Sequence, residues 1–225
     1  MNTVQTLERI RREIPDNITI VAAAKTRTAD EVRQIADAGI TDIGGNYIQE
    51  TLTVQKELGP TAAQMRWHMI GHVQKNKINK ILGAFDVIQT IDSIELAAAI
   101  DKRADKPVTA CIEINSGSEP QKTGFLPENA ETAIREIALF KNIDIIGLMT
   151  MGPRFGDPEK ARPYYRATKS LFDHIASSNI PNVSMDVLSM GMSNAYGIAV
   201  EEGATMIRLG TVLFGTCRAS NYEAP

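Results

Sequence analysis

Lys25 is the residue whose type and position most clearly suggest chemistry. It follows directly after the apolar run from Ile18 to Ala24, and lysine is among the side chains least often buried. Desolvation and a nearby cation such as Arg208 favour the neutral amine, which is the form that attacks a carbonyl carbon to make a Schiff base. The alternative is that Lys25 reaches into solvent from a strand end or pairs with a carboxylate.

Two segments near the end of the chain have the pattern of an anion site. Residues 189–194, SMGMSN, are typical of a strand end, a glycine turn and a helix capped by Ser193. A helix start of this kind presents free backbone N–H groups to an anion. Residues 206–211, MIRLGT, add Gly210, which lets the backbone approach a ligand, and the Thr211 hydroxyl. An ordinary helix cap and tight turn is the alternative.

Arg208 distinguishes two kinds of ligand chemistry. A lysine and an anion site together predict a phosphorylated aldehyde or ketone, which is either pyridoxal 5'-phosphate or the sugar phosphate of a Schiff-base aldolase. An arginine beside a pyridine nitrogen keeps that nitrogen unprotonated and weakens the cofactor as an electron sink. An aldolase would need a further proton donor, for which Glu113 is the only obvious candidate.

Short apolar runs alternate with segments of helical periodicity along the whole chain. The expected strands are residues 18–25, 42–45, 66–70, 85–91, 108–115, 143–149, 184–189 and 206–214, and the expected helices include 29–38, 49–58, 93–103, 128–140, 158–176 and 193–202. About eight such alternations predict an α/β fold, a single (β/α)8 TIM-type barrel with an extra N-terminal helix over residues 1–14. A doubly wound open sheet is the alternative. No linker divides the chain, so we expect one domain over residues 1–225.

The barrel prediction selects candidate site residues, because working groups of parallel barrels lie at the carboxyl ends of strands. These positions are Lys25, Asn46, His68, Asn115, Met149, Ser189 and Arg208. His68 is either part of the pocket wall or a hydrogen-bonded core residue, and Met149 fills the barrel end. Helix starts are expected at Thr28, with Glu31 completing a capping box, at Asp157 and at Ser193.

Composition excludes several classes of protein. The 225 residues contain 24 Lys and Arg against 27 Asp and Glu, a net charge of -3, so we expect no nucleic-acid partner. No apolar run approaches the length of about 20 residues that spans a membrane, so we expect no membrane partner. The two cysteines show no metal or disulfide spacing, and no metal site is expected. These features predict a cytoplasmic protein.

Short segments along nearly the whole chain match one known family in order. They are AAKT (residues 23–26), GNYIQE (45–50), WHMIGHVQKNK (67–77), TIDS (90–93), EIN (113–115), KTG (122–124), GLM (147–149), LSMGMS (188–193), IRLGT (207–211) and FG (214–215). With this ordered set the sequence resembles the pyridoxal phosphate homeostasis proteins, also called YggS-like proteins. The resemblance implies a barrel related to the N-terminal domain of alanine racemase.

The resemblance also implies a ligand and a role. It implies that Lys25 holds pyridoxal 5'-phosphate as a Schiff base and that Arg208 lies beside the pyridine nitrogen. It places Ser189, Ser193, Gly210 and Thr211 in the phosphate-binding segments, and we expect Asn46, His68 and Met149 to complete the pocket. The implied role is intracellular homeostasis of the cofactor, without an established catalytic reaction.

Other expectations follow from the same resemblance. Transient contact with pyridoxal phosphate-dependent apoenzymes is expected, with the protein itself a monomer or weak homodimer. The alternatives are an amino-acid racemase or related enzyme, and a barrel without cofactor that serves as an interaction module. The sequence departs from the family where Gly45, Ala195 and Gly197 replace residues that are usually acidic.

Overall fold

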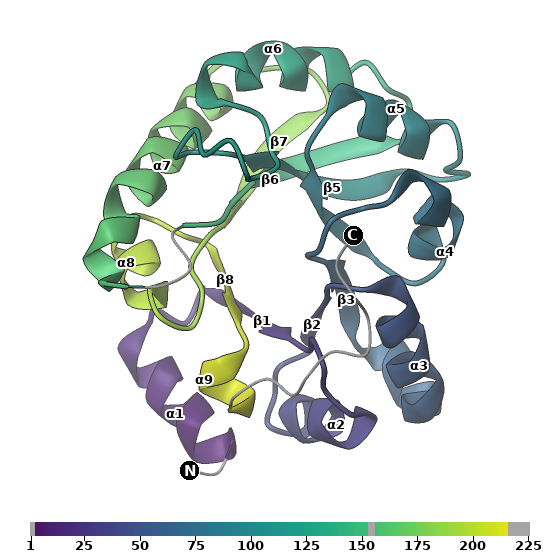
Figure 1. The fold of residues 1–225 in the computed structure, drawn as a ribbon, viewed down its shortest axis with the longest axis vertical. Helices are drawn as coiled ribbons and strands as arrows, with labels where there is room; N and C mark the ends of the chain where they lie inside the picture. The colour runs from purple at the N-terminus through teal and green to yellow at the C-terminus, as the bar shows by residue number, and fades with distance from the viewer. Residues whose placement is uncertain (1–2, 153–155, 216–225) are drawn as a thin grey trace.

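The strands of the computed structural model close into one parallel barrel. The structure describes residues 3–152 and 156–215. The strands are β1 (Thr19–Ala23), β2 (Asp42–Gly45), β3 (Arg66–Met69), β4 (Val87–Ile91), β5 (Val108–Ile114), β6 (Ile143–Thr150), β7 (Val183–Ser189) and β8 (Met206–Leu209). They pair in sequence order and β1 closes the ring with β8, which confirms the TIM-type barrel over the open sheet (Figure 1).

The helices form the outer ring, as expected of a barrel whose strands alternate with helices. The α-helices are α1 (Thr3–Glu13), α2 (Ala29–Asp37), α3 (Ile48–Leu58), α4 (Ile78–Leu82), α5 (Ile94–Asp101), α6 (Pro127–Ile137), α7 (Arg162–Ser177), α8 (Tyr196–Glu201) and α9 (Thr211–Phe214). Short 3-10 helices span Gly59–Gln64, Lys75–Lys77 and Pro158–Ala161. The extra helix at the N-terminus is confirmed as α1, and no helix of the described residues is long and apolar enough to cross a membrane.

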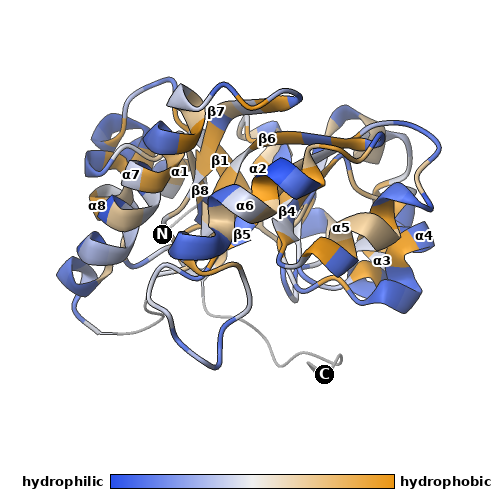
Figure 2. Ribbon diagram, turned by 90° about the horizontal axis from the view of Figure 1, so that it is seen from above, coloured by the Kyte–Doolittle hydropathy of each residue, from blue (hydrophilic) through white to orange (hydrophobic). Residues whose placement is uncertain are grey.

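Apolar and polar residues occupy different parts of the barrel. Ile43, Ile112 and Ile134 belong to the apolar core between the strands and the helices. Figure 2 shows the strands mostly in the hydrophobic colour, with hydrophilic segments on peripheral helices and loops. The barrel interior, by contrast, contains buried polar side chains, including the fully buried His68 and Ser189. The interior is therefore able to hold polar chemistry away from water.

Two predicted element ends were wrong. The expected strand from 206 to 214 ends at Leu209, because Gly210 (φ -116°, ψ -86°) turns the chain into α9. The expected helix from 158 to 176 is a 3-10 turn, Pro158–Ala161, followed by α7. The capping box of Thr28 and Glu31 and the Asp157 cap, whose carboxylate accepts from the Glu159 N–H, are confirmed.

The predicted helix start at Ser193 was also wrong. Helix α8 begins at Tyr196, its N-cap position is Ala195, and no side chain caps it. The Ser193 hydroxyl instead accepts hydrogen bonds from the backbone N–H groups of Gly210 and Val212, at 3.1 and 3.3 Å. The sequence pattern thus identified Ser193 as a hydrogen-bond acceptor for backbone N–H groups. These N–H groups belong to the turn after β8 and not to the helix that follows Ser193.

Candidate functional site

Lys25 lies two residues beyond the end of β1, at the carboxyl end of the barrel. Its side chain is partly buried, and its Nζ lies 5.4 Å from the centre of the Tyr47 ring, within the range of a cation–π contact. Lys25 forms no hydrogen bond or ion pair with any residue that the structure describes. Among the described residues the amine therefore lies near an aromatic face and has no carboxylate within ion-pair distance.

The turn after Lys25 is strained. Thr26 has a φ of 62°, a left-handed conformation that is unusual for a β-branched residue, and its Oγ1 is buried without a hydrogen-bond partner among the described residues. Its N–H donates to Glu50 Oε1 at 2.9 Å. Burial raises the pKa of Glu50, while the Thr26 N–H and the charge of Lys25 act to lower it. Helix α3 thus holds this turn in place through Glu50, which the sequence did not indicate.

Arg208 is a buried cation in the barrel interior. Its side chain donates from Nη1 to Ser189 Oγ at 2.7 Å and from Nη2 to the Thr150 carbonyl oxygen at 2.9 Å. Burial lowers its pKa, and it forms no ion pair with a carboxylate of the described residues. The guanidinium orientation therefore depends on two neutral acceptors, one of the backbone and one of a side chain.

The two C-terminal turns come together around Ser193. Its hydroxyl accepts from Gly210 N and Val212 N, so it joins the turn after β7 to the turn after β8. Gly191 enters the first turn with a φ of 97°, and a Cβ there would lie 2.6 Å from the Ala199 Cβ. Within the described residues, the N–H groups of Met192, Ser193 and Thr211 have no acceptor. Several backbone donors at one place make a site that suits an anion.

The same turns lie next to the strand that carries Lys25. Strands β1 and β8 are paired, with Val21 opposite Arg208 and Ala22 opposite Leu209. A Cβ built on Gly210 would lie 3.6 Å from the Ala23 Cβ, two residues before Lys25. Lys25 and the turns that carry Ser193, Gly210 and Thr211 are therefore neighbours at one end of the barrel.

The remaining candidate residues occupy different environments. Asn46 is partly buried after β2, where the Gly71 backbone approaches its carbonyl oxygen so closely that a Cβ on Gly71 would lie 2.2 Å from it. Met149 is fully buried in β6. His68 is fully buried, and both of its ring nitrogens have protein partners. This is the environment of a hydrogen-bonded core residue, one of the two alternatives given above for His68. Asn115 uses its side chain within its own loop, on Glu119 and Lys122.

Glu113 is the titratable carboxyl group of the barrel interior. Its side chain is almost completely buried, and its Oε1 accepts from the Thr123 hydroxyl at 2.9 Å. Its pKa is raised to about 7, chiefly by burial and to a smaller extent by the charge of Asp92, against the Thr123 hydrogen bond and the charge of Arg208, which act to lower it. This carboxyl group is therefore able to exchange a proton near neutral pH.

Gly45, one of the departures from the family pattern, faces away from the barrel interior. A Cβ at Gly45 would lie 2.1 Å from Thr51 Oγ1 and 3.0 Å from the Phe85 ring. In this chain, Thr51 and Phe85 occupy the space that a larger side chain would need. Position 45 therefore points towards helix α3 and not into the barrel interior.

Comparisons with known proteins identify the family of this chain. The model of the family "Alanine racemase, N-terminal domain" matches residues 4–218. The "Pyridoxal phosphate homeostasis protein" of Aquifex aeolicus is 36% identical over 199 residues, covering 87% of this chain and 86% of that protein. Its namesake in Synechocystis is 33% identical over 205 residues, covering 90% and 93%.

Solved structures show the same relationship. PipY of Synechococcus elongatus with PLP bound superposes with a TM-score of 0.86 at 28% identity, covering 95% of this chain and 100% of that one. The alanine racemase of Clostridium difficile shares the fold, with a TM-score of 0.77 at 17% identity, and 56% of its chain is covered. By the family model and by these relatives, the chain belongs to the pyridoxal phosphate homeostasis protein family, whose barrel is that of the alanine racemase N-terminal domain.

Proposed function

We propose that this protein binds pyridoxal 5'-phosphate and holds it reversibly on Lys25 as part of intracellular homeostasis of the cofactor. The observation that carries the proposal is that the Lys25 amine lies at the same barrel end as the N–H groups of Ser193 and Thr211. Among the described residues, neither the amine nor these N–H groups have a hydrogen-bond partner. When bound, pyridoxal phosphate supplies an aldehyde that an amine captures reversibly. The relatives named above and the ligand of PipY support this choice of cofactor.

Each group of site residues would contribute a different interaction to cofactor binding. The backbone donors around Ser193, Gly210 and Thr211 would hold the phosphate, whose charge needs several N–H groups. Arg208 would face the pyridine nitrogen, and as a donor with no acceptor it would leave that nitrogen unprotonated. Tyr47 would keep the Lys25 side chain in place through its ring. Asn46, Ser189 and Met149 would form the nearby walls of the pocket.

We further propose that the protein acts as a carrier and not as an enzyme. Reversible capture by Lys25 limits free aldehyde while allowing release to another amine, including the lysine of an apoenzyme. The names of its relatives describe homeostasis and not a reaction, which supports this role. The racemase alternative makes a different prediction, namely steady turnover of an amino acid that is lost with Lys25.

The test of binding is the absorbance spectrum of the purified protein with added pyridoxal phosphate. We expect a yellow band in the wild type, and we expect borohydride reduction to fix the cofactor to Lys25 in peptide maps. We expect both Lys25→Ala and Lys25→Arg to lose the band. Lys25→Arg loses it although it keeps a positive charge near the Tyr47 ring. Lys56→Ala, which changes an exposed lysine of α3, keeps the band. An equal band in Lys25→Ala would refute the proposal.

The test of the carrier role is a pair of assays on the loaded protein. We expect the bound cofactor to activate an added pyridoxal phosphate-dependent apoenzyme, and we expect no racemisation of amino acids above the rate of free cofactor. Racemisation that depends on Lys25 would replace the carrier proposal with the enzyme alternative.

A further inference from the structure

A chain of hydrogen bonds crosses the barrel interior from Arg208 to the opposite wall. Arg208 Nη1 donates to Ser189 Oγ at 2.7 Å, and Ser189 Oγ donates to Gln89 Oε1 at 2.7 Å. Gln89 Nε2 lies 3.0 Å from His68 Nδ1, and His68 Nε2 lies 2.9 Å from Asp42 Oδ1. The chain joins β8, β7, β4, β3 and β2 in turn. Because β4 and β7 are not neighbours in the barrel, the bond between Ser189 and Gln89 spans the interior.

The interior links of this chain are shielded from water. Ser189, Gln89 and His68 are fully buried, and Arg208 is 5% exposed. The Asp42 side chain, in the first residue of β2, is 20% exposed. Hydrogen bonds in such surroundings are electrostatically stronger than in water, and each bond polarises the next. A buried group of this chain that loses its hydrogen-bond partner therefore has no bulk water to replace it.

The hydrogen bonds of this chain all run from donor to acceptor in one direction, because its first group can only donate and its last group can only accept. An arginine only donates and a carboxylate only accepts. Since Ser189 accepts from Arg208, its single hydroxyl proton is free to go to Gln89 Oε1. The Gln89 amide nitrogen then faces His68 Nδ1, so the proton of the neutral imidazole lies on Nε2 and is donated to Asp42.

A second contact of Gln89 supports this orientation of its amide group. Gln89 Nε2 lies 3.2 Å from the Met206 sulfur, a weak acceptor. Both amide hydrogens thus have an acceptor in this orientation. In the reversed orientation, the Ser189 hydroxyl proton would lose its acceptor, and His68 would need a proton on Nδ1. A buried hydroxyl without an acceptor is costly, so the forward direction is favoured.

We propose that Asp42, His68 and Gln89 are positioning residues that orient the Arg208 guanidinium through this directional chain. Among the described residues, Arg208 has one backbone acceptor, Thr150, and one side-chain acceptor, Ser189, whose hydroxyl donates in turn to Gln89. The consequence for the cofactor rests on the proposed function, in which Arg208 faces the pyridine nitrogen. The chain itself exists in the ligand-free protein, so it is tested separately from cofactor binding.

The first arm of the test is nitrogen NMR of the ligand-free protein. We expect the His68 ring to show the Nε2–H tautomer, and we expect Asp42→Ala to shift both this signal and the Arg208 Nε–H resonance. Asp42→Asn, which keeps an acceptor for His68, restores both signals. Asp86→Ala is the matched control, because the Asp86 carboxylate accepts from the Trp67 N–H next to His68 but is not in the chain.

The second arm measures cofactor binding by titration of the absorbance band. We expect Asp42→Ala and Gln89→Leu to weaken the affinity about tenfold, and Asp42→Asn and Asp86→Ala to stay within about threefold of the wild type. Gln89→Met, which keeps an unbranched shape, replaces Gln89→Leu if the latter does not fold.

The outcomes separate the two proposals. An Nδ1–H tautomer in the wild type, or an Arg208 signal that Asp42→Ala does not move, would overturn the positioning role. The same holds if the signals move but the affinity does not. A wild type that shows the chain by NMR and binds no cofactor would instead refute the proposed function.

Discussion

Glu113 makes the stability of the protein depend on pH. Burial raises its pKa to about 7, so the folded protein keeps a proton that the unfolded chain, with an ordinary carboxyl pKa of about 4.3, releases. The contribution to stability is therefore fully present below about pH 4 and is lost as the pH rises to about 7 and above. Glu113→Gln removes this dependence while keeping an acceptor for the Thr123 hydroxyl.

We expect the difference in unfolding free energy between Glu113→Gln and the wild type to grow in favour of the variant between pH 4 and pH 8. The growth amounts to at most about 4 kcal/mol. Urea unfolding at a series of pH values measures it, and Glu57→Gln, which changes an exposed carboxyl group of α3, serves as the control. A difference that is the same at all pH values would show that Glu113 titrates as an ordinary carboxyl group.

At the scale of elements, helix α8, which follows the turn of Ser193, has a sequence that stabilises a helix only weakly. It has six residues, no side-chain cap and a glycine, Gly197, in its first turn. A Cβ on Gly197 would meet no atom within 4 Å, whereas Gly203, just after the helix, has a φ of 90° and its Cβ would lie 2.7 Å from Lys169 Cε. Gly197 therefore weakens the helix without a structural need for glycine, whereas the backbone conformation at Gly203 requires glycine.

Substitution of these glycines should change stability in opposite directions. We expect Gly197→Ala to raise the unfolding free energy by about 0.5–1 kcal/mol, because alanine favours a helix over glycine. Gly197→Glu should do at least as well, since a carboxylate suits the first turn. Gly203→Ala is expected to lower the unfolding free energy by about 1 kcal/mol, because the backbone at position 203 is left-handed. Thermal unfolding of the variants distinguishes them, and a loss of stability in Gly197→Ala would contradict this account of α8.

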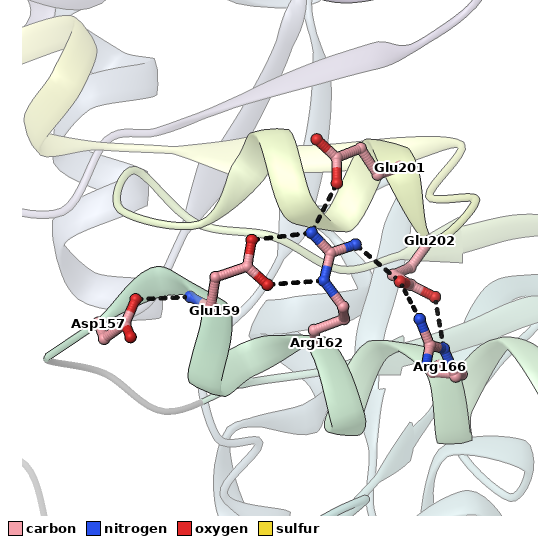
Figure 3. Close-up of polar contacts among 6 residues, drawn as sticks. All are labelled: Asp157, Glu159, Arg162, Arg166, Glu201 and Glu202. Atoms are coloured by element: carbon pink, nitrogen blue, oxygen red, sulfur yellow. Dashed lines mark hydrogen bonds and ion pairs between the residues drawn. The ribbon is translucent and has the colours of Figure 1, made fainter.

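An ion-pair cluster attaches α8 to the start of α7 (Figure 3). Arg162 donates to both oxygens of Glu159 at 2.7 and 2.8 Å, to Glu201 at 2.7 Å and to Glu202 at 2.8 Å. Arg166 also donates to both oxygens of Glu202, at 2.9 and 3.1 Å. Networks that join several charges in good geometry contribute more than isolated surface pairs. The cluster therefore helps to hold the C-terminal end of α8 against the start of α7.

Arg162→Ala should loosen α8 without unfolding the barrel. We expect faster amide hydrogen exchange in α8, with unchanged exchange in β1 and β8, because local opening follows the loss of local contacts. At high salt, the exchange rates of α8 in the wild type should approach those of the variant, since salt screens exposed charges. Arg33→Ala is the control, as its ion pair with Asp30 lies within α2. Equal exchange of α8 in wild type and Arg162→Ala would show that the cluster does not restrain this helix.

For the whole molecule, cofactor binding and folding stability are linked. A ligand that binds only the folded protein at 100 times its Kd adds about 2.7 kcal/mol to the free energy of unfolding. For a chain of this size that corresponds to a rise of about 5–10 °C in Tm. We expect pyridoxal phosphate to produce such a rise in the wild type and a much smaller one in Lys25→Ala. Scanning calorimetry over a range of cofactor concentrations checks this, and equal shifts in the two proteins would argue for binding elsewhere.

The sequence by itself determined the architecture and the ends of most strands. Alternation of apolar runs with helical periodicity is a local property, so it predicted a barrel and placed Lys25, Ser189 and Arg208 at or near strand ends. It also identified the turns that carry Ser193, Gly210 and Thr211. Local capping chemistry predicted the Thr28 box because its partner is only three residues away.

Only the tertiary structure decided which of these residues meet and what each polar group contacts. Ser189 and Gln89 are 100 residues apart and bond across the barrel, and Ser193 bonds a turn 17 residues away. Asp42 and Gln89 carried no signal in the sequence, because their roles depend on strand register and on the alternation of inward and outward side chains. The direction in which Gly45 faces depends on the same alternation. Contacts across a closed barrel follow from its geometry, and local patterns do not contain that information.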